Sequence, residues 1–252
     1  MNKVLLYFAL KYHGDWDQIY QALERKEKIS FEALDTFEVK IKCQYITILD
    51  PQYPPTLKSI YKPPFVLFYY GDFRLLQNYD QNLLLFISPK PSQYGFQQTL
   101  KFIKELVDHQ KRILMFYEES ITTKILSALP PSAGSQIIFF LYKNSISDFY
   151  LNNPNSTIRQ CLVISESYDQ KSINLKNHIR RIVIALAFRI LFIQTNKYDD
   201  SEKLFNYIID YQKKLFCLPD QINKDNKNNR YLKLGALVVE NVADIMQSWA
   251  ND

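Results

Sequence analysis

Hydrophobic residues in the first part of the chain recur at the spacing of short amphipathic helices. Between the first two groups, His13-Gly14-Asp15 offers a glycine stop followed by an acidic N-cap, which separates one helix from the next. We therefore predict a small helical bundle over residues 1–42. The groups are Leu5 with Phe8, Trp16 with Ile19, and Phe31 with Phe37.

The pattern changes after Tyr45, where prolines punctuate the chain. Residues 50–55 read DPQYPP, and Pro63-Pro64 comes directly before the apolar run Phe65–Tyr69. Proline donates no backbone hydrogen bond and does not fit the interior of a helix or of a central strand. These residues predict an extended connector that leads into an edge strand.

Residues 83–245 alternate between short, wholly apolar runs and longer amphipathic segments. This alternation is typical of a mostly parallel sheet that is covered by helices on both faces, so we predict an α/β fold. The expected strands are Leu83–Ile87, Ile113–Tyr117, Ile137–Tyr142, Leu162–Ser165, Ile190–Gln194, Leu215–Leu218 and Leu237–Val239. The expected helices are Gly95–Gln110, Asn174–Phe188, Asp200–Lys213 and a last one at Asn241–Trp249.

Composition narrows the class of protein without naming a function. The 252 residues carry a net charge of only +5, so clustering of cations matters more than their total. Three scattered cysteines favour buried thiols over disulfides or a zinc site. The apolar N-terminal stretch is interrupted by Lys11 and His13, too short for a membrane span and without a signal cleavage site. We therefore expect a cytoplasmic protein with no membrane partner.

One segment resembles a known family. Residues 53–72 read YPPTLKSIYKPPFVLFYYGD, which is similar to the YP..L..I.DPP.VLF..G pattern of the DNA-processing protein A (DprA/Smf) family. Ser92–Gly95 resembles the end of that family's GTRxxSxYG loop, and Leu162–Glu166 resembles its LLSE strand. Residues 180–186 are similar to the helix that follows its RNR triplet, and residues 218–245 to its VPG…GA.LV…DI ending.

The chain also departs from these patterns. The glycine and arginine of GTR fall on Ile87 and Pro89, so that Lys90 is the nearest cation, and the SGLAxGID stretch is not recognisable around Leu114–Thr123. The RNR triplet reads Ile179-Arg180-Arg181.

The resemblance implies an extended Rossmann-like domain over residues 43–252, preceded by a small helical, SAM-like domain over 1–42. It further implies single-stranded DNA binding without enzymatic turnover or a cofactor, a homodimer, and the loading of a RecA-type recombinase during recombination or natural transformation.

Two clusters of residues suit contact with DNA. Residues 170–198 contain six Lys or Arg residues and no Asp or Glu, and Lys171, Lys176, Arg180 and Arg181 surround the start of a predicted helix. Such cations neutralise phosphates, and arginine also stacks on bases. Lys90 and Ser92 lie in a loop after the first core strand, at the edge of the sheet where ligands of α/β folds bind. We predict that the two clusters form one electropositive trough.

Other kinds of site find little support in the sequence. The loop at 88–94 holds two prolines and no glycine, which disfavours a dinucleotide cradle. The three histidines lie in separate segments, no GxSxG or P-loop occurs, and Glu118-Glu119 reads as a solvated turn. Two alternatives remain open: a nucleotide hydrolase resembling the lysine-decarboxylase-like phosphoribohydrolases, although its PGGxGTxxE loop is missing, and a decayed relative that acts only as an interaction module.

Overall fold

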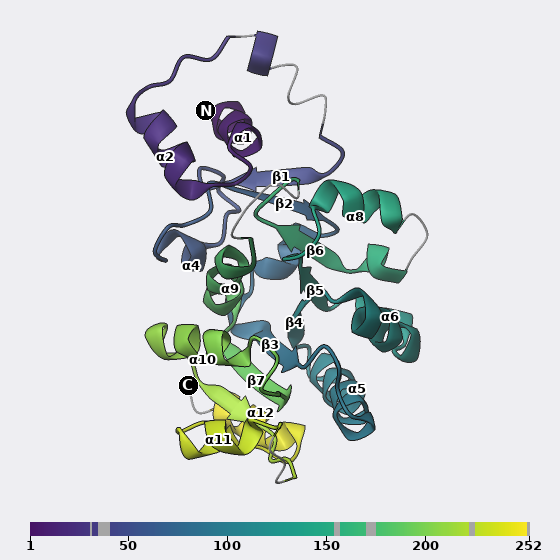
Figure 1. Cartoon of the computed structure of the whole chain (residues 1–252). Helices are drawn as coiled ribbons and strands as arrows, with labels where there is room; N and C mark the ends of the chain where they lie inside the picture. Colours follow the sequence, from purple (N-terminus) through teal and green to yellow (C-terminus); the bar gives the residue numbers. More distant parts are fainter. Residues whose placement is uncertain (31, 35–40, 154–156, 170–174, 222–224, 251–252) are drawn as a thin grey trace. The chain divides into compact units, whose positions relative to one another are not determined.

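The structure, a computed structural model, describes residues 1–30, 32–34, 41–153, 157–169, 175–221 and 225–250 (Figure 1). The chain forms two compact units. The first comprises Met1–Gln77 and Phe139–Leu186, and the second comprises Asn78–Ile138 and Ala187–Asp252.

The first unit combines the N-terminal helices with a small mixed sheet whose strand order is β1-β2-β6-β5. The short strand β5 is divided between the units, and only its last two residues belong to the first. The elements of this unit are α1 (Asn2–Lys11), α2 (Trp16–Glu24), β1 (Gln44–Thr47), α4 (Pro55–Lys58), β2 (Val66–Tyr70), η1 (Phe73–Leu76), the end of β5 (Ile137–Phe140), α8 (Ile146–Asn152), η3 (Thr157–Gln160), β6 (Leu162–Ser165) and α9 (Leu175–Leu186).

The predicted boundary between the first two helices is confirmed. The Asp15 side chain caps α2 by accepting a hydrogen bond from the Gln18 amide, and Gly14 adopts φ +76°, where a residue with a Cβ would be strained. A Cβ on Gly14 would also lie 3.0 Å from the Glu166 carbonyl oxygen, so this turn packs directly against the end of β6. The third apolar group, Phe31 with Phe37, lies outside the described residues.

The prediction that residues 65–69 form an edge strand is wrong. Strand β2 pairs with β1 on one side and with β6 on the other, both antiparallel. The edge position belongs to β1, whose four residues are too short to give a clear alternation of apolar and polar positions. The prolines before β2 lie outside its hydrogen-bonded ladder, so they do not disturb its central place.

The second unit holds the strands in the order β5-β4-β3-β7-β8-β9. Its pairs β3–β4, β3–β7, β7–β8 and β8–β9 are all parallel. The elements are η2 (Tyr79–Gln81), β3 (Asn82–Ile87), α5 (Gln93–Asp108), β4 (Arg112–Phe116), α6 (Glu119–Ala128), α7 (Pro131–Gly134), the start of β5, β7 (Arg189–Gln194), α10 (Ser201–Asp210), β8 (Leu215–Cys217), α11 (Asn228–Lys233), β9 (Leu237–Val238) and α12 (Val242–Ala250).

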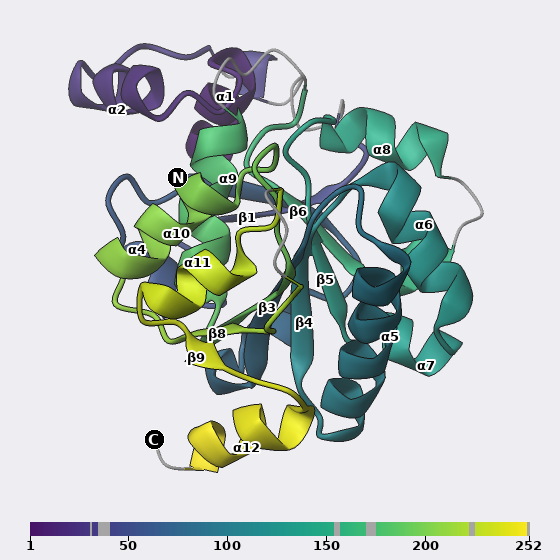
Figure 2. The ribbon, with the colours of Figure 1, turned by 60° about the horizontal axis from the view of Figure 1, so that its bottom comes forward.

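The core of the second unit consists of these parallel strands, with α5 and α10 on opposite sides of them (Figure 2). All six residues of β3 are buried, which explains why the apolar runs were uninterrupted. The predicted α/β fold with a mostly parallel sheet, helices on both faces and an N-terminal helical part is therefore confirmed. Glu118-Glu119 is not a solvated turn, because Glu118 precedes α6 and Glu119 is its first residue.

The division into a helical domain over 1–42 and a Rossmann-like domain over 43–252 stays a prediction.

None of the helices in the described ranges is long and apolar enough to cross a membrane. Likewise, the described residues form no group of three or more His, Cys, Asp or Glu side chains suited to a metal ion.

Candidate nucleic-acid interface

A cavity of ≈ 730 Å³ lies in the second unit where three parallel strands end. Loops that follow β3, β7 and β8 supply its walls, which is the position where open α/β sheets bind ligands. Its size falls in the range of cavities that hold small molecules or a nucleotide. Residues that line it include Lys90, Tyr94, Gln194, Asn196, Asp220 and Asn226.

The start of helix α5 is anchored to this cavity by the end of β7. Ser92 caps the helix, because its hydroxyl accepts a 3.1 Å hydrogen bond from the Gly95 amide. The Gln194 side chain accepts from the Ser92 amide at 2.8 Å and donates to the Ser92 hydroxyl at 3.1 Å. A Cβ on Gly95 would lie 2.4 Å from Gln194 Oε1, so glycine is what allows the helix and the strand to approach this closely.

The floor of the cavity is a network of amides around one carboxylate. Asp220 Oδ2 accepts a 2.8 Å hydrogen bond from Gln194 Nε2 and another from Asn226 Nδ2, and its Oδ1 accepts from the Gln221 amide at 2.7 Å. Asn229 also binds this turn, since its Nδ2 donates a 2.6 Å hydrogen bond to the Asp220 carbonyl oxygen. The polar groups of the floor are thus fixed before any ligand binds.

The rim of the cavity carries a cation and an aromatic ring. Lys90 is exposed in the loop after β3, and the Tyr94 side chain, in the first turn of α5, is 49% exposed. Tyr198 lies in the loop after β7, two residues beyond the lining residue Asn196; it is 79% exposed, and Lys197 Nζ lies 4.8 Å from the centre of its ring. A hydrogen bond to Asp225 raises the pKa of Lys197 to about 12, so this lysine remains charged at any physiological pH.

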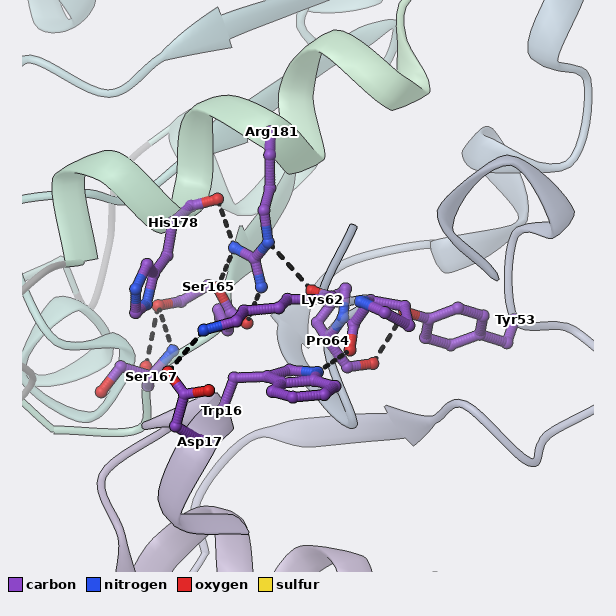
Figure 3. Close-up of polar contacts among 11 residues, drawn as sticks. Trp16, Asp17, Tyr53, Lys62, Pro64, Ser165, Ser167, His178 and Arg181 are labelled. Atoms are coloured by element: carbon purple, nitrogen blue, oxygen red, sulfur yellow. Dashed lines mark hydrogen bonds and ion pairs between the residues drawn. The ribbon is translucent and has the colours of Figure 1, made fainter. Parts of the chain in front are cut away.

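The first unit gathers the family-like motifs around a buried ion pair. Arg181, on α9, donates two hydrogen bonds to Glu166 at the end of β6, from Nη1 to Oε2 at 2.8 Å and from Nη2 to Oε1 at 2.5 Å. Both side chains are almost fully buried, at 7% and 5% exposure. Arg181 also donates to the carbonyl oxygens of Lys62 at 3.0 Å and His178 at 2.5 Å (Figure 3).

The proline-rich connector is bound to the same cluster. Tyr53 donates from its hydroxyl to the Pro64 carbonyl oxygen at 2.7 Å, and Trp16 donates from Nε1 to the Pro63 carbonyl oxygen at 2.8 Å (Figure 3). Burial raises the pKa of Tyr53, and the nearby charge of Glu166 adds to the effect, so the hydroxyl stays protonated as a donor. The motif residues of this unit therefore hold connector, strand and helix together.

The predicted site residues differ in where the structure places them. Lys90 and Ser92 belong to the cavity in the second unit. Lys171 lies outside the described residues, and for Lys176 only its place on α9 is described. Arg180 and Arg181 are buried in the first unit, at 2% and 6% exposure, and Arg181 is bound to Glu166. Glu166, at the end of the LLSE-like segment, accepts both of these hydrogen bonds from Arg181.

Sequence reasoning missed the amide floor of the cavity. Gln194, Asp220 and Asn226 come from three separate segments and match no short motif. Two weak signals existed: Asp220 stands where the VPG-like ending has a glycine, and the run of asparagines at residues 223–229 follows it. Neither signal reveals that these side chains meet at the end of β7.

Known proteins share a sequence segment and the fold with this chain. The family model for "DNA recombination-mediator protein A" matches residues 44–114. No curated protein sequence matches the chain. The fold is similar to DNA processing protein A from Streptococcus pneumoniae, with a TM-score of 0.69 and 16% sequence identity over 98% of this chain and 97% of that one.

A second similar structure is DNA processing protein A from Helicobacter pylori, with a TM-score of 0.68 and 23% identity over 84% of this chain and 98% of that one. That structure is described for its single-stranded DNA binding mode. The family model therefore confirms the resemblance to the DNA-processing protein A family over residues 44–114, and the fold of nearly the whole chain is similar to that of DNA processing protein A from Streptococcus pneumoniae.

Proposed function

We propose that this protein binds single-stranded DNA at the cavity of the second unit. The observation that carries the proposal is the cavity itself, with a fixed polar floor, a lysine on its rim and an exposed tyrosine beside it. The likeness to the Helicobacter pylori protein, described as binding single-stranded DNA, supports this choice of ligand.

Each rim residue has a physical task in such a complex. Lys90 neutralises a phosphate and releases a counterion, and the first amides of α5 add donors beside it. Tyr94, and Tyr198 two residues beyond the lining residue Asn196, offer ring faces on which bases stack, worth roughly 1–3 kcal/mol for each base. Ser92 fixes the first turn of α5 by capping it, and its hydroxyl faces the bound DNA strand in this proposal.

The basic residues of the first unit have two different roles in this proposal. Lys171 and Lys176 are proposed to add phosphate contacts, on the strength of the run of cations in the sequence. Arg180 and Arg181 are buried, so we assign them to the support of that helix: the guanidinium of Arg181 already bonds a carboxylate and two carbonyl oxygens. A phosphate would have to displace Glu166 to reach it.

We further infer a mediator that acts without turnover. In this hypothesis the protein works as a homodimer in the cytoplasm, protects incoming single strands and passes them to a RecA-type recombinase. The support is the family resemblance together with a cavity whose polar groups suit binding rather than bond cleavage.

The test is fluorescence anisotropy with a labelled 20-nucleotide single strand and the matching duplex at two salt concentrations. We expect tighter binding to the single strand, and a weaker complex at higher salt. Lys90→Glu should weaken binding several-fold and reduce the salt slope by about 0.7, the loss of one phosphate contact.

The matched control is Lys104→Glu. Lys104 is exposed on α5, about 16 Å along the helix axis from its first residue, Gln93, and carries the same charge as Lys90. Equal losses of affinity in the two variants would remove the site assignment. Absence of single-strand binding by the unaltered protein would refute the proposed function.

A further inference from the structure

The charges around the cavity do not suit a phosphate inside it. Among the described lining residues, the charged side chains are Lys90, Asp220 and Asp225. Asp225 is neutralised by Lys197, whose Nζ lies 2.6 Å from its Oδ1. What remains is one cation on the rim and one carboxylate in the floor. A phosphate on Lys90 is attracted, whereas a phosphate lowered into the cavity meets the negative charge of Asp220.

The same floor suits a neutral group that carries an N–H donor. A carboxylate has about four positions at which it accepts hydrogen bonds. Within the part of the chain that the structure describes, three donors reach Asp220: Gln194 and Asn226 on Oδ2, and the Gln221 amide on Oδ1. One acceptor position on Oδ1 is left for a ligand. Asp220 is only half-buried and lines the cavity, so a ligand can reach it.

Bases differ in what they offer to such an acceptor. Cytosine presents the N–H donors of its 4-amino group, whereas uracil and thymine present a carbonyl oxygen at the same position. A carboxylate accepts from the amino group and repels the carbonyl oxygen. An unpaired acceptor in a desolvated site also costs free energy, which increases the discrimination.

We propose that the cavity receives an unstacked base of the bound strand and that Asp220 selects bases with an exocyclic amino group. The inference rests on the proposed function, because it takes single-stranded DNA as the ligand. Gln194 and Asn226 act as positioning residues that fix the direction of the carboxylate, and Lys90 holds the adjoining phosphate at the rim.

The experiment compares oligomers of deoxycytidine and deoxyuridine of equal length, which share size and lack the thymine methyl group. We expect the unaltered protein to bind the cytosine oligomer more tightly, on the order of tenfold, as one hydrogen bond to a charged acceptor allows. A third oligomer of 2-pyrimidinone nucleotides, which lack both the 4-amino group and the 4-carbonyl oxygen, should bind more weakly than the cytosine oligomer but no more weakly than the uracil oligomer.

Two variants locate the selection. Asp220→Ala should bring the ratio of the two affinities to about one, mainly by improving binding of the uracil oligomer. Asp210→Ala removes the same charge from an exposed position at the end of α10 and should leave the ratio unchanged.

The outcomes separate this inference from the proposed function. Equal affinity of the unaltered protein for the cytosine and uracil oligomers, or a ratio that survives Asp220→Ala, overturns the inference and leaves DNA binding intact. Failure to bind any single-stranded oligomer overturns the proposed function and this inference with it.

Discussion

The buried pair of Arg181 and Glu166 gives the sharpest prediction on stability. Replacing Arg181 by Met keeps most of the side-chain volume but removes four hydrogen bonds, two to Glu166 and two to the carbonyl oxygens of Lys62 and His178. The carboxylate of Glu166 is then left at 5% exposure without its cation. Breaking such a buried pair on one side costs about 3–5 kcal/mol.

The double variant with Met at 181 and Leu at 166 is expected to be less damaging than the two single changes suggest. It leaves no buried charge, only two carbonyl oxygens without their donor, at about 1–3 kcal/mol each. We expect its loss of unfolding free energy to fall short of the sum of the single losses by at least about 2 kcal/mol.

Urea unfolding measured by tryptophan fluorescence provides the assay. The chain has two tryptophans, and Trp16 lies in this cluster, bonded to the Pro63 carbonyl oxygen and 5.3 Å from the ring of Phe65. In a Trp249→Phe background, the signal reports on the first unit alone. With a slope of about 2 kcal/mol per molar urea, the single change at 181 should lower the midpoint by about 2 M. A loss below about 1 kcal/mol, or strictly additive losses, would refute the assignment of a buried, coupled pair.

Three further predictions concern single side chains. Gly95→Ala should destabilise the second unit by about 1–3 kcal/mol, although Ala favours helices, because its Cβ displaces Gln194 from its hydrogen bonds. A thermal scan that shows no loss of stability would contradict the close approach of Gly95 to Gln194. Burial lowers the pKa of Lys213 to about 8, below the unfolded value of about 10.4. The unfolding free energy should therefore rise between pH 8 and 9.5, by at most about 1.4 kcal/mol per pH unit, and Lys213→Met should flatten this rise. Burial also lowers the pKa of His178, so the first unit should lose stability as the pH falls below about 6.5. If His178→Gln keeps the same sensitivity to acid, His178 is not the group responsible.

The sequence was sufficient for the elements that depend on local patterns. Wholly apolar runs such as Leu83–Ile87 became buried parallel strands, because a strand covered on both faces has no polar side. The turn at Gly14 and the cap at Asp15 follow from backbone rules within a few residues. The order of strands did not follow in the same way, and β2 occupies a central position that no local signal encodes.

The candidate site shows the same division. The place of Lys90 at the carboxyl end of the first core strand came from the sequence, because a loop after a strand has a known position in an α/β fold. The burial of Arg181 could not be predicted from the sequence, since a basic helical segment has the same pattern whether it faces water or a carboxylate from another strand. The partner, Glu166, is fifteen residues away in sequence and meets Arg181 only because β6 and α9 pack together in the first unit.

By itself, then, the amino-acid sequence determined most of the strands and the longer helices, the α/β class and the family resemblance, since each depends on neighbours along the chain. The tertiary structure alone decided that Gln194, Asp220 and Asn226 form one hydrogen-bonded floor and that Arg181 is an internal support. Hydrogen bonds and ion pairs act over about 3 Å, and only the folded backbone brings groups from distant segments within that range.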